Sequence, residues 1–428
     1  MPKNEHRPGY KKAKVGWIPD EWKEVALEDI AQIERGKFSA RPRNDPKYYG
    51  GPYPFLQTGD VSTSDGIVYS YSQTLNASGL AVSKLFPSGT LLVTIAANIG
   101  DVAEVPFDFA CPDSLVAVQA NENIHRFWLK CFLKAKKKYF VSKATQNAQA
   151  NINLQTIRPT LVQLPPLLEQ EAIAAVLVCW DKAIRHLEVK IGKRRLVKQG
   201  LMQKLLSGRI RLPGFSKPWM NTRLEGLGVF SKGAGISKEE LSTKGAPCIR
   251  YGEIYTVHNF VLKEFHSFVN PALAAISVKI TANDLLFAGS GETAEEIGKS
   301  VAYMGDVEAY AGGDIILLSV NPVKGRADYL SYYLNTIGRR ELNKLGQGQS
   351  VVHIYPKNLS KVNLALPPLE EQQAIAKVLA TADSEIDTLE RKLALFKDQK
   401  KFLLNNLVAG TIRLPQFCNH GKHRKARK

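Results

Sequence analysis

The stretch LPPLLEQEAIAAVL, residues 164–177, returns as LPPLEEQQAIAKVL, residues 366–379. When residue n is set against residue n + 202, residues 164–215 align with 366–417 without a gap, and 25 of the 52 positions are identical. A repeat of two copies with so long a period indicates a duplicated half-protein rather than a solenoid of short units. The chain is therefore expected to contain two halves of the same design.

Each copy of the repeat carries a heptad pattern in which apolar residues recur at alternating spacings of four and three, as in a coiled coil. The helix is expected to begin after LPPL and to end at Gly208 or Gly410, which suit left-handed helix ends. Each helix then has about 40 residues and a length of about 60 Å. The predicted helix–helix seam consists of Ile173, Leu177, Trp180, Ile184, Leu187, Ile191, Leu201 and Leu205 in the first copy and Ile375, Leu379, Ile386, Leu389, Leu393, Phe396, Leu403 and Leu407 in the second.

The two helices are expected to pack against each other, because both apolar stripes have the same length and each needs to be buried. A pseudo-twofold relation between the copies favours antiparallel packing. Lys198 and Lys400 occupy equivalent positions in the seam. Their side chains either extend along the seam to reach water or mark a place where the seam opens for another subunit.

Composition limits the class of protein. The 428 residues are enough for two or three domains, and the longest apolar runs are too short to span a bilayer. The N-terminal residues are basic and polar and lack the apolar centre of a signal peptide. The five cysteines lie far apart without a CxxC pair, which predicts a reducing cytoplasm and no metal site.

The net charge of +18 points to a polyanion as the partner, since lysine and arginine side chains that neutralise phosphates release condensed counterions. A basic surface that only improves solubility is the alternative. Residues 416–428 end in HGKHRKARK and are expected to form a basic tail that adds nonspecific charge.

The segments before the two helices resemble each other loosely. YPFLQTGDV (53–61) matches APCIRYGEI (246–254), and ACPDSLVAV (110–118) matches AGGDIILLS (311–319). Short β-branched runs separated by glycine, proline and asparagine are typical of strands and hairpins. Each half is predicted to be an α+β domain around a curved sheet. Helices are expected over residues 127–143 and 329–344.

Framework positions keep their chemistry between the halves, whereas two neighbouring positions change: Gln57 becomes Arg250 and Thr58 becomes Tyr251. Glutamine can pair bidentately with adenine and arginine with guanine in a major groove, so the halves are expected to read different sequences. Ordinary drift at exposed positions is the alternative.

Three polar loops supply further candidates for DNA contact: the basic loop RGKFSARPR (35–43) and the equivalent loops ATQNAQANI (144–152) and GQGQSVVHI (346–354). Solvated loops and helix caps are the alternatives. The predicted DNA-binding residues are Arg35, Lys37, Arg41, Arg43, Gln57, Thr58, Asn98, Gln146, Asn147 and Asn151 in the first half, and Lys232, Arg250, Tyr251, Ser290, Thr293, Gln347, Gln349 and His353 in the second.

No catalytic arrangement stands out in the sequence. GSGETAEEIGKS (289–300) ends like a phosphate-binding loop, but it lacks the required glycine at Thr293 and places carboxylates where backbone amides would hold an anion. NDPKYY (44–49) lacks the second proline of an amino-methylation motif. Together with the duplication, this favours a binding scaffold over an enzyme.

The tandem LPPLLEQEAIAAVL and LPPLEEQQAIAKVL, each following a β-rich segment and leading a long heptad helix into SGRIRLP or AGTIRLP, resembles the specificity (S) subunit of type I restriction–modification enzymes. The resemblance covers about residues 15–417. It implies two β-rich target-recognition domains separated by two long helices that form an antiparallel coiled coil. The implied segments are a first recognition domain at 1–163, a central helix at 164–212, a second recognition domain at 213–365, a C-terminal helix at 366–415 and a tail at 416–428.

The resemblance also implies the function. Such subunits are not catalytic; each recognition domain reads one half of a bipartite, asymmetric double-stranded DNA site. The paired helices set the spacer and dock two modification (methyltransferase) subunits, which restriction subunits with ATP-dependent translocase and nuclease activity join in defence against foreign DNA. S-adenosylmethionine, ATP and Mg belong to those partners, so this chain is expected to bind no cofactor, metal or membrane.

Two other functions stay open at this point. One is a single-chain DNA methyltransferase or nuclease with fused recognition domains, which would need a cofactor pocket. The other is a coiled-coil adaptor that does not bind DNA, against which the net charge of +18 argues.

Overall fold

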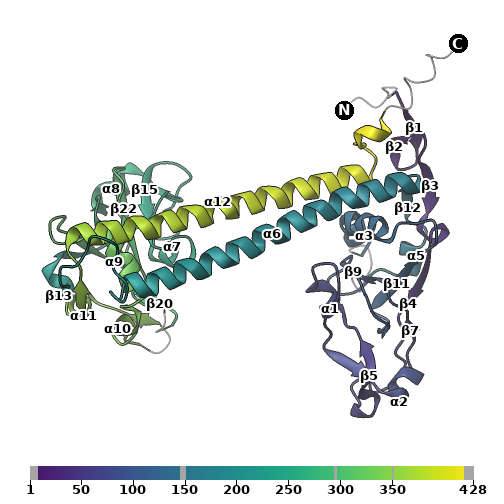
Figure 1. Ribbon diagram of the computed structural model, residues 1–428, viewed down its shortest axis with the longest axis horizontal. Helices are drawn as coiled ribbons and strands as arrows, with labels where there is room; N and C mark the ends of the chain where they lie inside the picture. Colours follow the sequence, from purple (N-terminus) through teal and green to yellow (C-terminus); the bar gives the residue numbers. More distant parts are fainter. Residues whose placement is uncertain (1–7, 145–150, 294–295, 349–350, 419–428) are drawn as a thin grey trace. The chain divides into compact units, whose positions relative to one another are not determined.

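The computed structural model describes residues 8–144, 151–293, 296–348 and 351–418. The chain divides into two compact units: unit 1 contains Met1–His186 and Leu393–Lys428, and unit 2 contains Leu187–Lys392. Each unit combines sheets with stretches of the two long helices, α6 (Leu167–Leu205) and α12 (Leu369–Val408) (Figure 1). The two units are built to the same plan and are described one at a time.

Unit 1 contains two four-stranded sheets and two two-stranded ones. The larger sheets have the strand orders β4-β11-β8-β9 and β6-β5-β10-β7, and the smaller ones are β12-β3 and the N-terminal hairpin β1-β2. The strands are β1 (Tyr10–Ala13), β2 (Gly16–Pro19), β3 (Lys23–Ala26), β4 (Ala31–Arg35), β5 (Tyr49–Phe55), β6 (Gln73–Leu75), β7 (Leu85–Phe86), β8 (Leu91–Thr94), β9 (Val102–Glu104), β10 (Phe109–Ala110), β11 (Leu115–Ala120) and β12 (Leu161–Leu164). The short helices are α1 (Thr58–Ser62), α2 (Ala77–Ala81), α3 (Arg126–Ala135), α4 (Lys137–Ala144) and α5 (Leu154–Ile157).

Unit 2 repeats this design. Its larger sheets have the orders β14-β23-β19-β21-β16 and β17-β15-β22-β18, and its smaller ones are β13-β25 and β20-β24. The strands are β13 (Met220–Arg223), β14 (Gly228–Lys232), β15 (Ala246–Ile249), β16 (Val261–Leu262), β17 (Ser267–Val269), β18 (Val278–Ile280), β19 (Asp284–Ala288), β20 (Ser290–Gly291), β21 (Ser300–Tyr303), β22 (Ala309–Ala311), β23 (Ile315–Val320), β24 (Val352–His353) and β25 (Asn363–Leu366). The short helices are α7 (Tyr251–Thr256), α8 (Pro271–Ile276), α9 (Ala327–Leu334), α10 (Arg339–Asn343) and α11 (Pro356–Leu359).

The helices predicted over 127–143 and 329–344 are each interrupted, so the prediction of one continuous helix is wrong in both halves. The first divides into α3 and α4 at Lys136, which ends α3. In the second, α9 ends at Leu334 and α10 begins after Gly338, whose amide donates to the carbonyl of Tyr333. In each pair the first helix carries most of the buried side chains, so the second helix can change direction without exposing the core.

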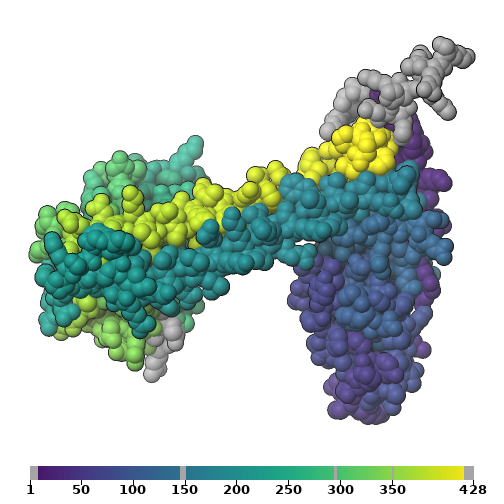
Figure 2. All heavy atoms as spheres, in the orientation of Figure 1, coloured from purple at the N-terminus to yellow at the C-terminus, as the bar shows by residue number. Residues whose placement is uncertain are grey.

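The core of each unit is closed by both long helices. In unit 1, Trp22 and Trp128 pack in one cluster with Ile173 of α6 and Leu407 of α12. In unit 2, the corresponding cluster joins Tyr329 to Leu205, Leu206, Ile375 and Leu379. Figure 2 shows the yellow end of α12 in unit 1 lying against the teal start of α6 and the purple N-terminal strands. The core of each unit is therefore completed by the C-terminal end of the long helix from the other repeat.

Antiparallel packing is visible inside each unit. In unit 1, Trp180 of α6 meets Phe396 of α12 with ring centroids 5.1 Å apart, and Lys400 bonds Asp181. In unit 2, Lys198 bonds Asp383. The early part of one helix thus faces the late part of the other in both units, as the pseudo-twofold argument predicted.

The predicted seam residues are all buried or half-buried. Lys198, however, does not reach water: its side chain is 10% exposed, and its ammonium lies 4.2 Å from the centre of the Phe260 ring as well as on Asp383. The expectation that this lysine extends along the seam to solvent is therefore wrong. A carboxylate and an aromatic face compensate the buried charge instead.

The repeated sequence LPPL-x-EQ has a structural explanation in both copies. Glu169, which is 1% exposed, accepts hydrogen bonds from Nε1 of Trp22 (2.9 Å) and from Nε and Nη2 of Arg413 (3.0 and 2.8 Å). Glu371, fully buried, binds Arg211 in the same way, with Nη2 at 2.6 Å. Because each arginine belongs to the IRLP segment of the opposite repeat, we call these two ion pairs the crossed clasps.

The glutamine of the same motif fixes the helix start to its own domain. Gln170 donates to the carbonyl of Pro165 and accepts from the amide of His125, both at 2.9 Å. Gln372 makes the equivalent bonds to Pro367 (2.9 Å) and Arg326 (3.1 Å). After each helix, Gly208 and Gly410 adopt φ values of 70° and 68°, so the predicted left-handed glycines are confirmed, although α6 itself ends three residues before Gly208.

Candidate nucleic-acid interface

One turn organises the candidate DNA-binding loops of each unit. We call it the central turn: residues 110–115 in unit 1 and 311–315 in unit 2. In unit 1, the amide of Lys37 donates to Cys111 (2.9 Å), that of Leu56 to Ala110 (2.9 Å) and that of Ile95 to Ser114 (3.2 Å). The central turn thereby brings together the loop after β4, the start of α1 and the loop between β8 and β9.

The central turn of unit 2 makes the same connections. The amide of Gly312 donates to Ile249 (2.9 Å), just before Arg250, and the amide of Gly289 donates to Asp314 (2.7 Å), just before Ser290. The amide of Gly313 donates to Gly235, in the loop after β14. Segments that the sequence singled out separately therefore converge at the same edge in both units.

Glycine is required where the first loop crosses the central turn. A Cβ atom on Gly36 would lie 2.2 Å from the carbonyl oxygen of Pro112, and one on Gly233 would lie 2.0 Å from that of Gly312. Both contacts are far shorter than non-bonded carbon and oxygen atoms permit. The close approach is thus a property of the shared scaffold, whereas the side chains around it differ.

In unit 1, arginine side chains pack onto the central turn. Arg43 forms an ion pair with Asp113 at 2.9 Å, and Nε of Arg35 donates to the carbonyl of Asp113. Burial would raise the pKa of Asp113, but the hydrogen bond and charge of Arg43 and the charge of Arg35 lower it below its ordinary value. Lys37 and Arg41 are exposed, and Nη1 of Arg41 donates to the carbonyl of Ala40 (2.7 Å). These side chains form an exposed cationic loop.

The start of α1 and the start of α7 show how the scaffold and the side chains are separated. Asp60 caps α1 by accepting from the amide of Gln57 (2.7 Å), and Glu253 caps α7 by accepting from the amide of Arg250 (2.8 Å). The half-buried side chains of Gln57 and Arg250 are thus held at equivalent positions by equivalent caps. Nε2 of Gln57 also donates to Oε1 of Gln73 (3.0 Å), a residue that the sequence did not single out.

Unit 2 brings several of its candidates into direct contact. Oγ of Ser290 lies 2.9 Å from Nδ1 of His353, and the backbones of Gln347 and His353 pair at 2.9 and 2.8 Å. The hydroxyl of Tyr255 donates to the carbonyl of Ser290 (2.9 Å), and burial raises its pKa. Ser290 itself is 4% exposed, so its side chain supports His353 rather than facing solvent.

The remaining candidates lie around these contacts. Lys232 is exposed, 3.7 Å from Asp314 of the central turn. Thr293 and Asn98 are exposed in equivalent loops, and Asn151 is half-buried next to Ile152, whose amide donates to Ile95 (3.1 Å). Three predicted residues lie outside the described part of the chain: Gln146, Asn147 and Gln349.

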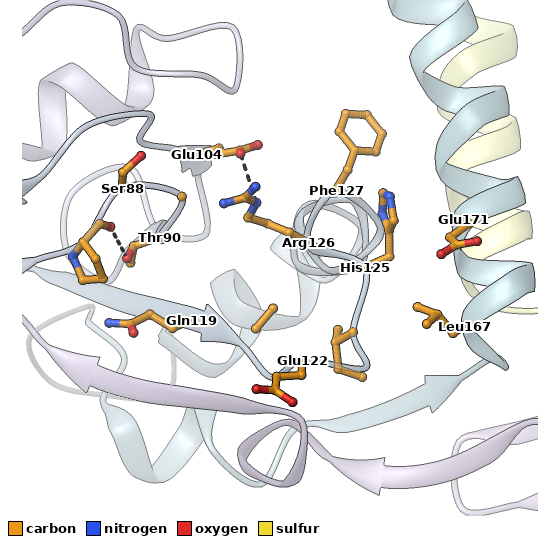
Figure 3. Close-up of a pocket in the computed structure, with 14 residues that line it drawn as sticks. Ser88, Thr90, Glu104, Gln119, Glu122, His125, Arg126, Phe127, Leu167 and Glu171 are labelled. Atoms are coloured by element: carbon orange, nitrogen blue, oxygen red, sulfur yellow. Dashed lines mark hydrogen bonds and ion pairs between the residues drawn. The ribbon is translucent and has the colours of Figure 1, made fainter.

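A different concave region lies at the opposite end of β8 in unit 1 (Figure 3). It has a volume of about 630 Å³ and is lined by the carboxylates of Glu104, Glu122 and Glu171. The guanidinium of Arg126 is paired with Glu104 at 3.2 Å. This acidic lining would repel a polyanion, so the cationic loops at the central turn are the better candidates for DNA contact.

The described residues hold no group of three or more histidine, cysteine, aspartate or glutamate side chains placed to bind a metal ion. Within the same ranges, no helix is both long and apolar enough to cross a membrane.

Two equivalent units, each of which holds polar loops of its own sequence on an equivalent turn, define a class of protein: a tandem reader of nucleic acid built by duplication. The chain belongs to the family described as "Type I restriction modification DNA specificity domain", which matches residues 19–192 and again residues 216–395. The two matched ranges correspond to the two copies of the design.

Relatives extend over nearly the whole chain. A protein of Methanocaldococcus jannaschii that carries the name of a type I restriction enzyme MjaX specificity subunit is 27% identical over 426 residues, 95% of this chain and 97% of its own length. The type I restriction enzyme MjaVIII specificity subunit of the same organism is 23% identical over 93% of this chain and 94% of its own length. The S subunit from M. genitalium, solved as a crystal structure, has the same fold, with a TM-score of 0.56, 15% identity, and coverage of 95% of this chain and 99% of that one.

Proposed function

We propose that this chain is the DNA-specificity subunit of a type I restriction–modification complex, and that each unit reads one half of a bipartite, asymmetric DNA site. The observation that carries the proposal is the duplicated central turn. It holds the same three loops in both units while the side chains at their tips differ.

Recognition is expected to divide into two kinds of contact. Arg35 at the end of β4 and the cations of the following loop, Lys37 and Arg43, are exposed, are suited to phosphates and would fix the register of the unit on the duplex. The side chains at the helix starts, Gln57 in unit 1 and Arg250 in unit 2, are suited to base edges in the major groove. Because equivalent caps hold these two positions, the difference between their side chains would become a difference between the bases read.

The paired helices are proposed to set the length of the unread spacer and to dock two methyltransferase subunits. Restriction subunits would complete the complex. The chain itself is proposed to be non-catalytic and cytoplasmic and to bind no cofactor, with S-adenosylmethionine, ATP and Mg bound by its partners. The match of the family to both halves and the continuous α6 and α12 support this assignment.

Exchange of one recognition unit tests the proposal. Residues 219–366 contain every strand of unit 2, whereas the long helices α6 and α12 and the crossed clasps lie outside this range. Replacing these residues by the equivalent segment of a relative with a known, different site should change one half of the methylated motif. Methylation profiling of a host that carries the partner subunits would measure both halves.

The reciprocal exchange of residues 22–164 is the matched control, and it should change the other half of the motif only. A motif that changes in both halves, or in neither, would contradict independent reading by the two units.

A further inference from the structure

A small pocket in unit 1 is not used by any contact described above. It lies between the end of α1, the loop that leads into β9 and the junction of α3 with α4, and has a volume of about 240 Å³. Its polar lining comes from Ser62, Ser64, Asp101, Lys134 and Lys137. Two of these groups, on Lys134 and Ser62, are left without partners.

Lys134 is half-buried, and in the described part of the chain its ammonium has neither a hydrogen bond nor an ion pair. Burial lowers its pKa, and the nearby charges of Lys130 and Lys400 lower it further. The neighbouring cations are compensated: Lys130 bonds the carbonyl of Gly66 at 3.3 Å and Glu104 at 3.4 Å, and Lys137 bonds Asp101. Of these three lysines, Lys134 is therefore the one whose ammonium has no hydrogen-bonded partner among the described residues.

The second unpartnered group is the hydroxyl of Ser62. Its oxygen is buried, and it finds no hydrogen-bond partner among the residues described. A buried hydroxyl without a partner costs free energy comparable to a lost hydrogen bond. Because this oxygen exposes almost no surface, Ser62 forms part of the wall of the pocket, and the ammonium of Lys134 is the unpartnered group that a ligand could reach.

The equivalent place in unit 2 shows that the scaffold does not require such a charge. The backbone amides of His125 and Arg326 bind equivalent glutamines, Gln170 and Gln372. Lys134 and Asn335 each follow nine residues later, so they occupy equivalent positions. Nδ2 of Asn335 donates to the carbonyl of Ser300 (2.6 Å), and its Oδ1 accepts from the amide of Ser300 (3.0 Å). The amide side chain is thus fully engaged inside the unit.

Unit 2 also places a lysine ammonium near this location, but it is bonded. Lys299, which follows Gly298 as Asp101 follows Gly100, donates to the carbonyls of Tyr255 (3.2 Å) and His258 (2.9 Å). The unpartnered ammonium of Lys134 therefore has no counterpart at the equivalent described positions of unit 2, whereas buried hydroxyls without a partner occur there too, on Ser300 and Thr336.

We propose that the pocket beside Lys134 binds a tetrahedral oxyanion, and that in the DNA complex this oxyanion is a backbone phosphate. The DNA assignment rests on the proposed function. The pocket is bordered by α1, which begins at Thr58, and by the loop that carries Asn98, so a phosphate bound there would lie beside two segments expected to contact DNA. Lysine side chains are common donors to phosphate in protein–DNA contacts.

The first test uses inorganic phosphate and the full chain. Phosphate replaces chloride at constant ionic strength, and thermal unfolding is followed for the wild type, Lys134→Met and the control Lys182→Met, which removes an exposed lysine of α6. Phosphate should raise the unfolding midpoint of the wild type and of Lys182→Met, because a ligand that binds the folded state stabilises it. Lys134→Met should not respond.

In chloride alone, Lys134→Met should unfold at the same temperature as the wild type or at a higher one, since it removes a half-buried charge without a partner. A lower midpoint would indicate that Lys134 has a structural role and would overturn the proposal. An equal response of all three proteins to phosphate would also overturn it, because the effect would then be an adventitious ion effect only.

The second test identifies the source of the oxyanion. For duplex DNA, the slope of log K against log salt should become shallower by about 0.9 in Lys134→Met, the contribution of one phosphate, and should stay unchanged in Lys182→Met. A phosphate response without this change in slope would overturn the DNA assignment and leave a site for free oxyanions. If the wild-type chain bound duplexes of every sequence equally well, this result would count against the proposed function, whatever the pocket binds.

Discussion

At the scale of single residues, the crossed clasps show why glutamate is needed in LPPL-x-EQ. Glu169 is buried and binds Trp22 and Arg413, so its charge is compensated by partners distant in sequence. The hydrogen bond and charge of Glu169 raise the pKa of Arg413, in opposition to its burial. The clasp therefore pairs a buried carboxylate with a guanidinium whose charged form it stabilises.

Glu169→Gln should therefore lower the stability of unit 1. Removing one partner of a buried ion pair costs about 3–5 kcal/mol, because the other charge is left uncompensated. Urea unfolding of the variant should give a clearly lower midpoint. The control is Glu21→Gln, which removes the exposed second carboxylate on Arg413 and should have a much smaller effect. Equal effects of the two substitutions would contradict a dominant role for the buried pair.

The sequence predicted the seam residues because a heptad pattern is local and needs no knowledge of the partner. It did not predict the clasps, since the periodicity of α6 contains nothing that points from Glu169 to Arg413. The central turn was missed for a related reason. ACPD and AGGD were recognised as equivalent, but the residues of the central turn act through backbone hydrogen bonds to three separate loops, and composition does not reveal such contacts.

At the scale of elements, the seam between α6 and α12 contains a polar site that can be tested by a double-mutant cycle. Lys198→Met leaves the carboxylate of Asp383 with only the hydroxyl of Tyr332, which donates to Oδ2 at 2.5 Å. Asp383→Asn removes the charge, and its side-chain oxygen can still accept from Tyr332. The double variant should therefore be more stable than Lys198→Met alone, by about 1–3 kcal/mol.

The equivalent pair Lys400–Asp181 serves as the matched comparison in unit 1. Its side chains are 25% and 30% exposed, against 10% and 16% for Lys198 and Asp383. Water screens the more exposed pair, so the same cycle there should give a smaller rescue. If the double variant of Lys198 and Asp383 is no more stable than Lys198→Met, the uncompensated charge of Asp383 is not what destabilises Lys198→Met.

The prediction of the short helices was wrong where one apolar pattern extended over two separate helices. Residues 329–344 look continuous because both α9 and α10 have apolar residues, yet Gly338 lies between them and its amide bonds back to Tyr333. Glycine within a helical pattern is a weak signal that tertiary packing decides. The long helices had no such interruption on their seams, and their predicted length agrees with the 39 and 40 residues observed.

At the scale of the whole molecule, the length of the helix pair can be changed without changing its register. Lys198 faces Asp383, so a point eight residues earlier in α6, at Lys190, corresponds to one eight residues later in α12, at Arg391. Four residues inserted after each position add about 6 Å of helix. The spacer of the methylated motif should then grow by one or two base pairs, measured by methylation profiling.

Insertion after Lys190 alone is the control for this experiment. It displaces Lys198 from Asp383 and moves the IRLP segment away from Glu371, so it should destabilise unit 2 instead of giving a new, defined spacer. A spacer that stays the same after the paired insertion would contradict the proposal that the helices set it.

The discontinuity of unit 1 has a consequence for how the chain is made. Ribosomes release the N-terminal domain first, and most domains can fold as soon as they emerge. Unit 1 cannot, because its core awaits Leu407 and its buried Glu169 awaits Arg413, which are translated only after all of unit 2. During synthesis the nascent N-terminal domain therefore remains incomplete, with apolar surface exposed to chaperones, until Leu407 and Arg413 have been translated.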